Sequence, residues 1–207
     1  MSRPRGSSRS RLVASAMMPE QRSRALRQEA DDVLGLIDLS RLSVSIGPLM
    51  PTGSYFMDLM MYPDIDVNLP LTTPENLMGI AVELSKLECV KRLRFLRGKE
   101  GPLKDGLYLK PDIEYGNWWR LWKIDIWSLP AAVLETAQTE MADLKRRMTA
   151  AHRAIILDTK FRLLTDEGRT PMYSGIFIYR AVINLGMIQP SEIDAYLIEN
   201  DIVLQLD

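Results

Sequence analysis

The sequence predicts an α/β fold of the α+β type, in which a mixed sheet with flanking helices is followed by a C-terminal helical domain. Three observations predict it. Residues 18–130 alternate between strand-like and amphipathic helical segments, and every segment after Pro130 is helical in character. The composition, 46% hydrophobic and 26% charged over 207 residues, is that of an ordinary globular protein. We therefore expect a disordered basic arm at residues 1–17, an α/β domain at 18–130 and a helical domain at 131–207.

The first half of the α/β domain is predicted to contain two helices and two strands. Pro19 suits the first turn of a helix, and apolar residues recur at helical spacing as far as Leu39. Val44 and Ile46 favour a strand, and Pro63 ends a short helix, because the residue before a proline is biased away from the helical region. The expected order is a helix at 18–39, a strand at 42–50, a turn at 51–54, a short helix at 55–61 and a strand at 64–69.

The remaining segments continue this pattern. Thr73 is a suitable N-cap for a helix at 75–87, which Pro74 opens. Strand signals return at 89–96, 106–109 and 118–129, with a turn-rich segment at 97–105 between the first two. After Pro130 we expect helices at about 131–148, 150–164, 174–187 and 191–199.

Cysteine content and charge restrict the environment and the partners. The single cysteine, Cys89, cannot form an internal disulfide, which favours a reducing compartment, with the cytoplasm as the default. No apolar run approaches the roughly 20 residues that span a bilayer, so no membrane partner is expected. The arm carries Arg3, Arg5, Arg9 and Arg11, and without these four charges the net charge of −1 becomes −5. The acidic body therefore argues against a nucleic-acid partner, and any such contact would have to be local.

Three acidic residues stand at strand positions that suit them poorly. Asp64 and Asp66 alternate with apolar residues in one predicted strand, and Asp125 lies between Ile124 and Ile126 in another. A carboxylate that is removed from water needs a partner, and Asp is a poor strand former. Because side chains alternate along a strand, Asp64 and Asp66 share a face, about 6.6 Å apart at the backbone. If the strand of Asp125 lies beside theirs, the three carboxylates need a cation, and Mg²⁺ or Mn²⁺ suits such oxygen ligands.

A phosphate site is predicted at Gly53-Ser54, shortly before the acid pair. Glycine lets a phosphate approach the backbone, the start of the short helix presents free N–H groups, and Ser54 adds a hydroxyl. The segment is not a P-loop, because Gly47-x5-Gly53-Ser54 has one residue too many before the second glycine and lacks the lysine. A triphosphate could bind at Gly53 and Ser54, although Ser54 is equally compatible with a role as a helix N-cap.

Together, Gly53-Ser54, Asp64-Ile65-Asp66 and Asp125 resemble the signature of the nucleotidyltransferase superfamily of the DNA polymerase β type. That signature is a Gly-Ser turn, about ten residues, an Asp-apolar-Asp pair and a third Asp on a later strand. The resemblance covers roughly residues 43–129, and the later helices are similar to the helical addition of small bacterial members, including antibiotic nucleotidyltransferases. The chain departs from the family after the serine, where residues 55–58 are Tyr-Phe-Met-Asp rather than small residues and Arg-Gly.

The resemblance implies a nucleotidyltransferase-type sheet and an enzyme that transfers a nucleoside monophosphate from an NTP, such as ATP, and releases pyrophosphate. The acceptor would be a hydroxyl of a small molecule or a macromolecule. Asp64 and Asp66 would hold two Mg²⁺ or Mn²⁺ ions, and Asp125 would complete the site of the ion that binds the acceptor hydroxyl and would take its proton. Gly53 and Ser54 would bind the β- and γ-phosphates.

Basic and aromatic residues supply further candidates. Lys160 and Arg180 interrupt apolar helix faces and are predicted triphosphate contacts, with surface salt bridges as the alternative. Residues 86–123 carry ten Lys and Arg against five acids, which is typical of a solvated strand face or of a surface near a triphosphate or an anionic acceptor. Alternation places Trp119 and Trp127 on the face of the third acid, where they suit either base stacking or core packing.

Three alternatives stay open. Asp64 and Asp66 are compatible with strand-edge acids in a turn after Pro63. The chain is also compatible with a catalytically silent nucleotidyltransferase-fold binding module or antitoxin-like partner, although the presence of Asp125 counts against it. A glycosyltransferase that uses Asp-x-Asp with Mn²⁺ and a nucleotide sugar fits the acid pair but leaves Gly53-Ser54 and Asp125 without a role.

Overall fold

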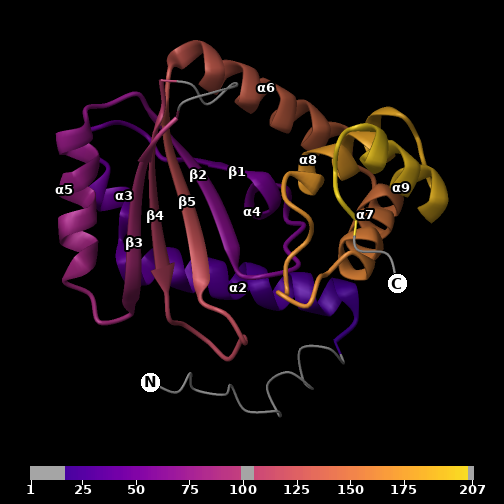
Figure 1. The fold of residues 1–207 in the computed structure, drawn as a ribbon, viewed down its shortest axis with the longest axis horizontal. Helices are drawn as coiled ribbons and strands as arrows, with labels where there is room; N and C mark the ends of the chain where they lie inside the picture. Colours follow the sequence, from indigo (N-terminus) through magenta and orange to yellow (C-terminus); the bar gives the residue numbers. More distant parts are fainter. Residues whose placement is uncertain (1–16, 99–104, 205–207) are drawn as a thin grey trace.

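The computed structural model describes residues 17–98 and 105–204, and it has a mixed α/β architecture (Figure 1). The predicted basic arm, apart from Met17, lies outside the described residues, as does most of the turn-rich segment at 97–105. Within the described chain, a five-stranded mixed sheet is flanked by helices, and the segment after Pro130 is helical, as the sequence predicts.

The sheet has the strand order β1-β2-β5-β4-β3. Strands β2 and β5 are parallel, and the other neighbouring pairs are antiparallel. The central parallel pair therefore joins two segments that are far apart in the sequence, whereas β3, β4 and β5 follow one another as a meander. The strands are β1 (Met50–Thr52), β2 (Asp64–Pro70), β3 (Val90–Arg97), β4 (Leu107–Ile113) and β5 (Trp122–Leu129).

Within the described residues, helices lie before the sheet, after the sheet and in two of the connections between strands. They are α2 (Pro19–Ile37), α3 (Leu39–Leu42), α4 (Gly53–Met57), α5 (Pro74–Ser85), α6 (Ala131–Arg147), α7 (Ala150–Arg162), α8 (Ser174–Tyr179) and α9 (Pro190–Glu199). Thr73 caps α5 as predicted, because its side chain accepts a hydrogen bond from the backbone N–H of Asn76. A π-helical turn, η2 (Arg180–Asn184), continues α8. None of the described helices combines the length and the apolar character that crossing a membrane requires.

Strand alternation separates the two faces of the sheet. Apolar residues such as Ile65, Val67, Ile124 and Ile126 are fully buried in a core with residues of α2 and α5, which cover one face (Figure 1). The side chains between them in the sequence project from the opposite face. We call this opposite face the acid-bearing face, because it carries Asp64, Asp66 and Asp125.

A second hydrophobic core belongs to the helical half and draws on α6, α7, α8 and α9. The segment around α4 also contributes to it, through the fully buried Met57, Leu59 and Met61. Arg153 of α7 ties the halves together, with ion pairs to Glu20 at 3.1 Å and to Asp58 at 3.0 Å. The segment between Gly53 and Asp64 is therefore fixed against the helical half.

Several local predictions differ from the structure. The turn expected at 51–54 is wrong, because Met50–Thr52 forms strand β1 and Gly53 begins α4. The short helix expected at 55–61 ends at Met57, where Asp58 adopts a left-handed conformation as its C-cap. The strand expected at 42–50 is wrong: Leu39–Leu42 is helical, and Ile46 and Gly47 donate backbone hydrogen bonds to the Ser43 carbonyl in a turn. Strand β5 begins at Trp122 rather than at residue 118. Strand β4 continues to Ile113 through Pro111, and its recorded pairing with β5 lapses at residues 110 and 111, where the proline lacks an N–H donor.

Candidate functional site

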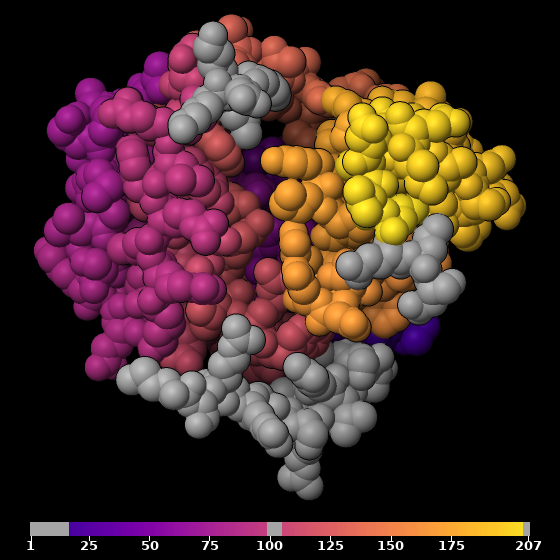
Figure 2. All heavy atoms as spheres, viewed as in Figure 1, coloured from indigo at the N-terminus to yellow at the C-terminus, as the bar shows by residue number. Residues whose placement is uncertain are grey.

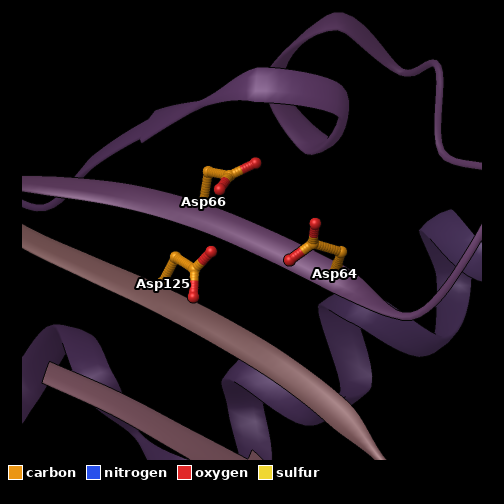
Figure 3. A group of neighbouring side chains, drawn as sticks. All are labelled: Asp64, Asp66 and Asp125. Carbon is orange, nitrogen blue, oxygen red and sulfur yellow. The ribbon is translucent and has the colours of Figure 1, made fainter. Parts of the chain in front are cut away.

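The three predicted acids meet between the two parallel strands at the centre of the sheet. Asp66 of β2 lies directly opposite Asp125 of β5, and Asp64 stands two residues earlier on the same face. Their carboxylates converge (Figure 3), and a ligand oxygen from each lies within 4.8 Å of the other two. Asp64 is buried, and the other two acids are half-buried. Parallel pairing of β2 and β5 is the feature that creates this cluster.

A lysine that sequence reasoning did not single out lies inside the cluster. Lys123 Nζ is 2.7 Å from Asp125 Oδ2 and 3.1 Å from Asp64 Oδ1. Asp64 Oδ1 is buried, and among the described residues the Lys123 ammonium is its close polar contact. Burial alone would lower the pKa of Lys123, but the charges of Asp64 and Asp125 outweigh it and raise that pKa. The ammonium group therefore stays charged and neutralises part of the cluster.

Asp66 makes no such direct contact with a cation, and the charges of Lys123 and Lys160 offset the rise of its pKa only in part. Among the described residues, no hydrogen bond or ion pair holds its carboxylate. Burial raises the pKa of Asp66 well above its usual value, and the negative charges of Asp64 and Asp125 add to this effect. Burial also raises the pKa of Asp64, against the opposing charge of Lys123. The cluster is thus unfavourable for ionised carboxylates unless further positive charge arrives.

Gly53 packs directly against the Asp66 carboxylate. The backbone of Gly53 has φ +59°, which favours glycine, and a Cβ atom built there would lie 2.3 Å from Asp66 Oδ2. Any larger residue would have to displace the carboxylate. Ser54 is the second residue of α4, and the N-cap position is held by Thr52, so the alternative role of Ser54 as N-cap is wrong. The predicted phosphate turn and the predicted acids are therefore immediate neighbours.

Two aromatic residues border the cluster on the other side. The Tyr108 hydroxyl of β4 donates a 2.5 Å hydrogen bond to Asp125 Oδ1. The Tyr108 ring stacks on Trp127 with centroids 4.5 Å apart. Trp127 lies two residues after Asp125 on the same face, as alternation predicts. Trp119 precedes β5, so alternation does not set its direction; it lies beside Trp118 and under the Arg22 guanidinium.

Lys160 and Arg180, the predicted triphosphate contacts, lie in the helical half. Lys160 is 2% exposed, and its ammonium donates hydrogen bonds to the Leu59 carbonyl at 2.6 Å and to the Tyr179 hydroxyl at 3.3 Å. Burial lowers the pKa of Lys160 to about 8, and the charges of Asp64 and Asp66 oppose this shift. Lys160 therefore interacts with Asp64 and Asp66 through its charge rather than through a direct hydrogen bond. Arg180 pairs with Glu140 at 2.6 Å.

The donor set fits a hard divalent cation. Carboxylate oxygens are the ligands that Mg²⁺ and Mn²⁺ prefer, and these ions usually combine one or two carboxylates with substrate phosphates. Among the described residues, the Asp66 carboxylate has no hydrogen-bond partner and the buried Asp64 Oδ1 contacts only the Lys123 ammonium, so both have lone pairs to offer. Gly53 has no side chain, which lets its backbone lie against the Asp66 carboxylate. The residues present therefore suit a metal-bound phosphate compound. The Lys123 ammonium would have to move away from Asp64 and Asp125, or remain beside the metal.

Comparisons with known proteins do not identify the chain. No protein-family model matches it, and no curated protein matches it. A functional assignment therefore has to be argued from the geometry of the described residues.

Proposed function

We propose that this protein is a metal-dependent nucleotidyltransferase that transfers a nucleoside monophosphate from an NTP to a hydroxyl group of an acceptor and releases pyrophosphate. The observation that carries the proposal is the contact of Gly53 with Asp66, at the point where the three carboxylates converge. A glycine backbone beside clustered carboxylates lets phosphate groups reach the same cations that the carboxylates hold. The proposal includes a nucleotidyltransferase-type identity for the mixed sheet.

The chemistry assigns a separate task to each acid. Two Mg²⁺ or Mn²⁺ ions, when bound, would neutralise phosphate charge and make the acceptor hydroxyl more acidic. Asp64 and Asp66 would hold both ions, and Asp125 would complete the site nearer the acceptor. The acceptor oxygen forms a bond to the α-phosphorus while the bond from this phosphorus to the pyrophosphate oxygen breaks, and Asp125 takes the hydroxyl proton. No covalent nucleophile is needed.

The surrounding residues position the nucleotide. Gly53 and Ser54 would bind the β- and γ-phosphates through the open backbone beside Asp66. Lys160 supports Asp64 and Asp66 through its charge, since its ammonium is already hydrogen-bonded to protein groups. In order to contact the nucleotide, Arg180 would have to exchange its ion pair with Glu140 for one with a phosphate. Both side chains are partly exposed, so this exchange is sterically possible.

One observation favours a second candidate function, a catalytically silent binding module or antitoxin-like partner. Lys123 already lies between Asp64 and Asp125, and an internal ammonium lets two of the three acids persist without a metal. A protein that keeps these acids for its fold, or for sensing a nucleotide, needs nothing more. The two candidates differ in turnover rather than in nucleotide binding.

The decisive experiment compares the parent with Asp125→Asn. Each labelled NTP is incubated with the full chain, Mg²⁺ or Mn²⁺ and a cell extract as the source of acceptor, and both pyrophosphate release and the destination of the label are measured. Calorimetry measures NTP affinity in parallel. Asp143→Asn, at an exposed ion pair of α6, is the matched control.

The transferase proposal expects pyrophosphate release from the parent and from Asp143→Asn. It expects a loss of several orders of magnitude in Asp125→Asn, with NTP affinity largely retained, because Asp64 and Asp66 still hold the nucleotide's own ion. Equal release from the parent and Asp125→Asn would remove Asp125 from the site. NTP binding without pyrophosphate release, for every nucleotide and extract, would support the silent module instead.

A further inference from the structure

The acid-bearing face extends beyond the three acids, across β5, β4 and β3. Residues that are directly opposite each other in a sheet project from the same face, so the strand register identifies its members. Trp127 lies opposite Tyr108, Tyr108 lies opposite Leu96, and Lys110 lies opposite Arg94. Beside the acids, the face is thus formed by Trp127 of β5, Tyr108 and Lys110 of β4, and Arg94 and Leu96 of β3. We call these five residues the flanking surface.

The flanking surface offers flat rings next to the proposed proton acceptor. Trp127 and Tyr108 stack on each other, both are half-buried, and Tyr108 is hydrogen-bonded to Asp125. The register extends this row to Leu96, which is 49% exposed. Stacking on aromatic side chains is how sheet surfaces bind the bases of single-stranded nucleic acids, independently of sequence.

The flanking surface is also positively charged. Arg94 is exposed, and among the described residues it has no ion-pair partner. Lys110 lies 3.7 Å from Asp112, which already has a closer partner in Arg92 at 2.8 Å. Asp112 is therefore shared between two cations, Arg92 and Lys110, and Arg94 adds a further positive charge outside the acid cluster of Asp64, Asp66 and Asp125. Phosphate groups are the natural counterpart of such a surface.

Nothing in the described chain covers this part of the sheet. Helix α2 passes behind the sheet, α5 lies next to β3, and the helical half lies beside β2 (Figure 1). In Figure 2 the strands β3 to β5 face the viewer, and the molecular surface is hollowed where they meet the C-terminal half.

We propose that the acceptor of this protein is a single-stranded polynucleotide that lies on the flanking surface with its terminal hydroxyl at Asp125. Its end base stacks on Trp127 and Tyr108, and its phosphates contact Lys110 and Arg94. The proposal rests on the transferase function above and uses the same transfer step, with a terminal ribose oxygen as the attacking group. The acidic net charge of the body does not oppose it, because the positive residues are gathered on this one surface.

The flanking surface itself, apart from the neighbouring acid cluster, disfavours a cationic acceptor. A polyamine-like or aminosugar substrate would bring its ammonium groups against Lys110 and Arg94, and like charges at such short range are repulsive. An acceptor without a flat ring would leave the aromatic pair without a partner. Both features select for a ligand that combines a base with phosphate.

Binding of the acceptor can be measured without NTP or metal. The full chain is titrated into a fluorescently labelled eight-nucleotide single-stranded RNA, and anisotropy is recorded at 50 mM and 200 mM salt. The variants are Arg94→Glu, Lys110→Glu and Trp127→Ala, with Lys86→Glu as the control, because Lys86 is an exposed residue at the end of α5 on the covered side of the sheet. A further variant with Gln at positions 3, 5, 9 and 11 removes the charges of the N-terminal arm. Melting curves check that each variant is folded.

We expect Arg94→Glu, Lys110→Glu and Trp127→Ala each to weaken RNA binding by about 10-fold or more. We expect Lys86→Glu to bind within about 2-fold of the parent, because its charge lies away from the flanking surface. The chain without arm arginines should still lose affinity when Arg94→Glu is added. Equal affinity of the parent and the three variants would overturn the proposal, and binding that disappears with the arm arginines alone would do the same. The basic residues of β3 would then only protect an edge strand from pairing.

Two further measurements separate this inference from the proposed function. An aminoglycoside that competes with the RNA, or that takes up label in its place, would overturn the polynucleotide assignment while leaving the transferase intact. Retained RNA binding in a protein that binds no metal–NTP complex would instead refute the transferase, and with it the role of the RNA as acceptor. In an active preparation, RNA with a blocked terminal hydroxyl should bind equally well but accept no label.

Discussion

Replacing Lys123 by methionine tests whether the Lys123 ammonium stabilises the acid cluster in the absence of a metal. The change removes an ammonium that lies 2.7 Å from Asp125 and 3.1 Å from Asp64. At an effective dielectric constant of about 20, each contact is worth about 5–6 kcal/mol of Coulomb attraction. Removing the ammonium from water offsets several kcal/mol of this gain. Since the loss of one partner leaves buried charge without compensation, we expect Lys123→Met to lower the free energy of unfolding by about 3–5 kcal/mol.

The measurement is urea and thermal unfolding, followed by circular dichroism at pH 8 in the presence of a chelator. For a protein of this size the expected loss corresponds to a fall in Tm on the order of 10 °C. Lys86→Met is the matched control, because Lys86 forms an exposed ion pair with Glu83 and its loss should change stability by less than about 1 kcal/mol. Adding Mn²⁺ should raise the Tm of Lys123→Met more than that of the parent, since the ion takes the place of the ammonium.

The pH dependence gives an internal check on the same variant. Burial raises the pKa of Asp64, and loss of Lys123 raises it further, so the folded variant binds a proton more readily than the unfolded chain. Protonation relieves the repulsion, and the deficit relative to the parent should therefore shrink as the pH falls from 8 towards 5. If Lys123→Met and the parent had the same Tm at pH 8 without metal, the reasoning would be refuted. A deficit independent of pH would show that packing, rather than charge, is lost.

Two further predictions concern the same cluster. Burial and the charges of Asp64 and Asp125 raise the pKa of Asp66 in the folded protein above its value in the unfolded chain. Protonation of Asp66 therefore stabilises the folded protein at acid pH, and this stabilisation is lost as the pH rises through the raised pKa. Asp66→Asn should therefore stabilise the metal-free protein at pH 8 by about 1–3 kcal/mol in urea unfolding. The same variant should lose Mn²⁺ binding, measured by electron paramagnetic resonance. A variant less stable than the parent would mean that the Asp66 carboxylate is structural. Gly53→Ala places a methyl group 2.3 Å from Asp66 Oδ2 at φ +59°, so it should cost about 1–3 kcal/mol in thermal unfolding and weaken NTP binding. Gly79→Ala, in helix α5 with open space around it, should be neutral or stabilising, and equal behaviour of the two alanine variants would contradict the close approach of Gly53 to the acids.

Much of the sheet and of the acid cluster could be predicted from local patterns. Alternation in Asp64–Leu69 placed both acids on one face, and the structure has them there. The Thr73-Pro74 sequence correctly marked the start of α5. These predictions succeed because period, capping and proline position are decided within a few residues of each other.

The contacts that could not be predicted from the sequence depend on strand pairings, which no local pattern contains. Lys123 stands two residues before Asp125, so alternation puts it on the same face, but its contact with Asp64 follows from the register of β2 against β5. The bond from Tyr108 to Asp125 likewise follows from the pairing of β4 with β5. The prediction of a strand at 42–50 was wrong because of local hydrogen bonds rather than strand pairing. Hydrogen bonds to the Ser43 carbonyl stabilise a turn that outweighs the strand preference of Val44 and Ile46.

The parallel pairing of β2 with β5 also has a kinetic consequence. Helix α5 and strands β3 and β4 lie between these two strands in the sequence, so their contact closes a long loop, whereas the β3-β4-β5 meander needs only short ones. A chain in which only the meander has formed carries Asp125 on one side and Asp64 and Asp66 in an unpaired segment elsewhere. If the chain binds cations and a nucleotide at these acids, as proposed, it can do so only after this long-range closure. Such binding would stabilise finished molecules by mass action, without guiding the chain towards them.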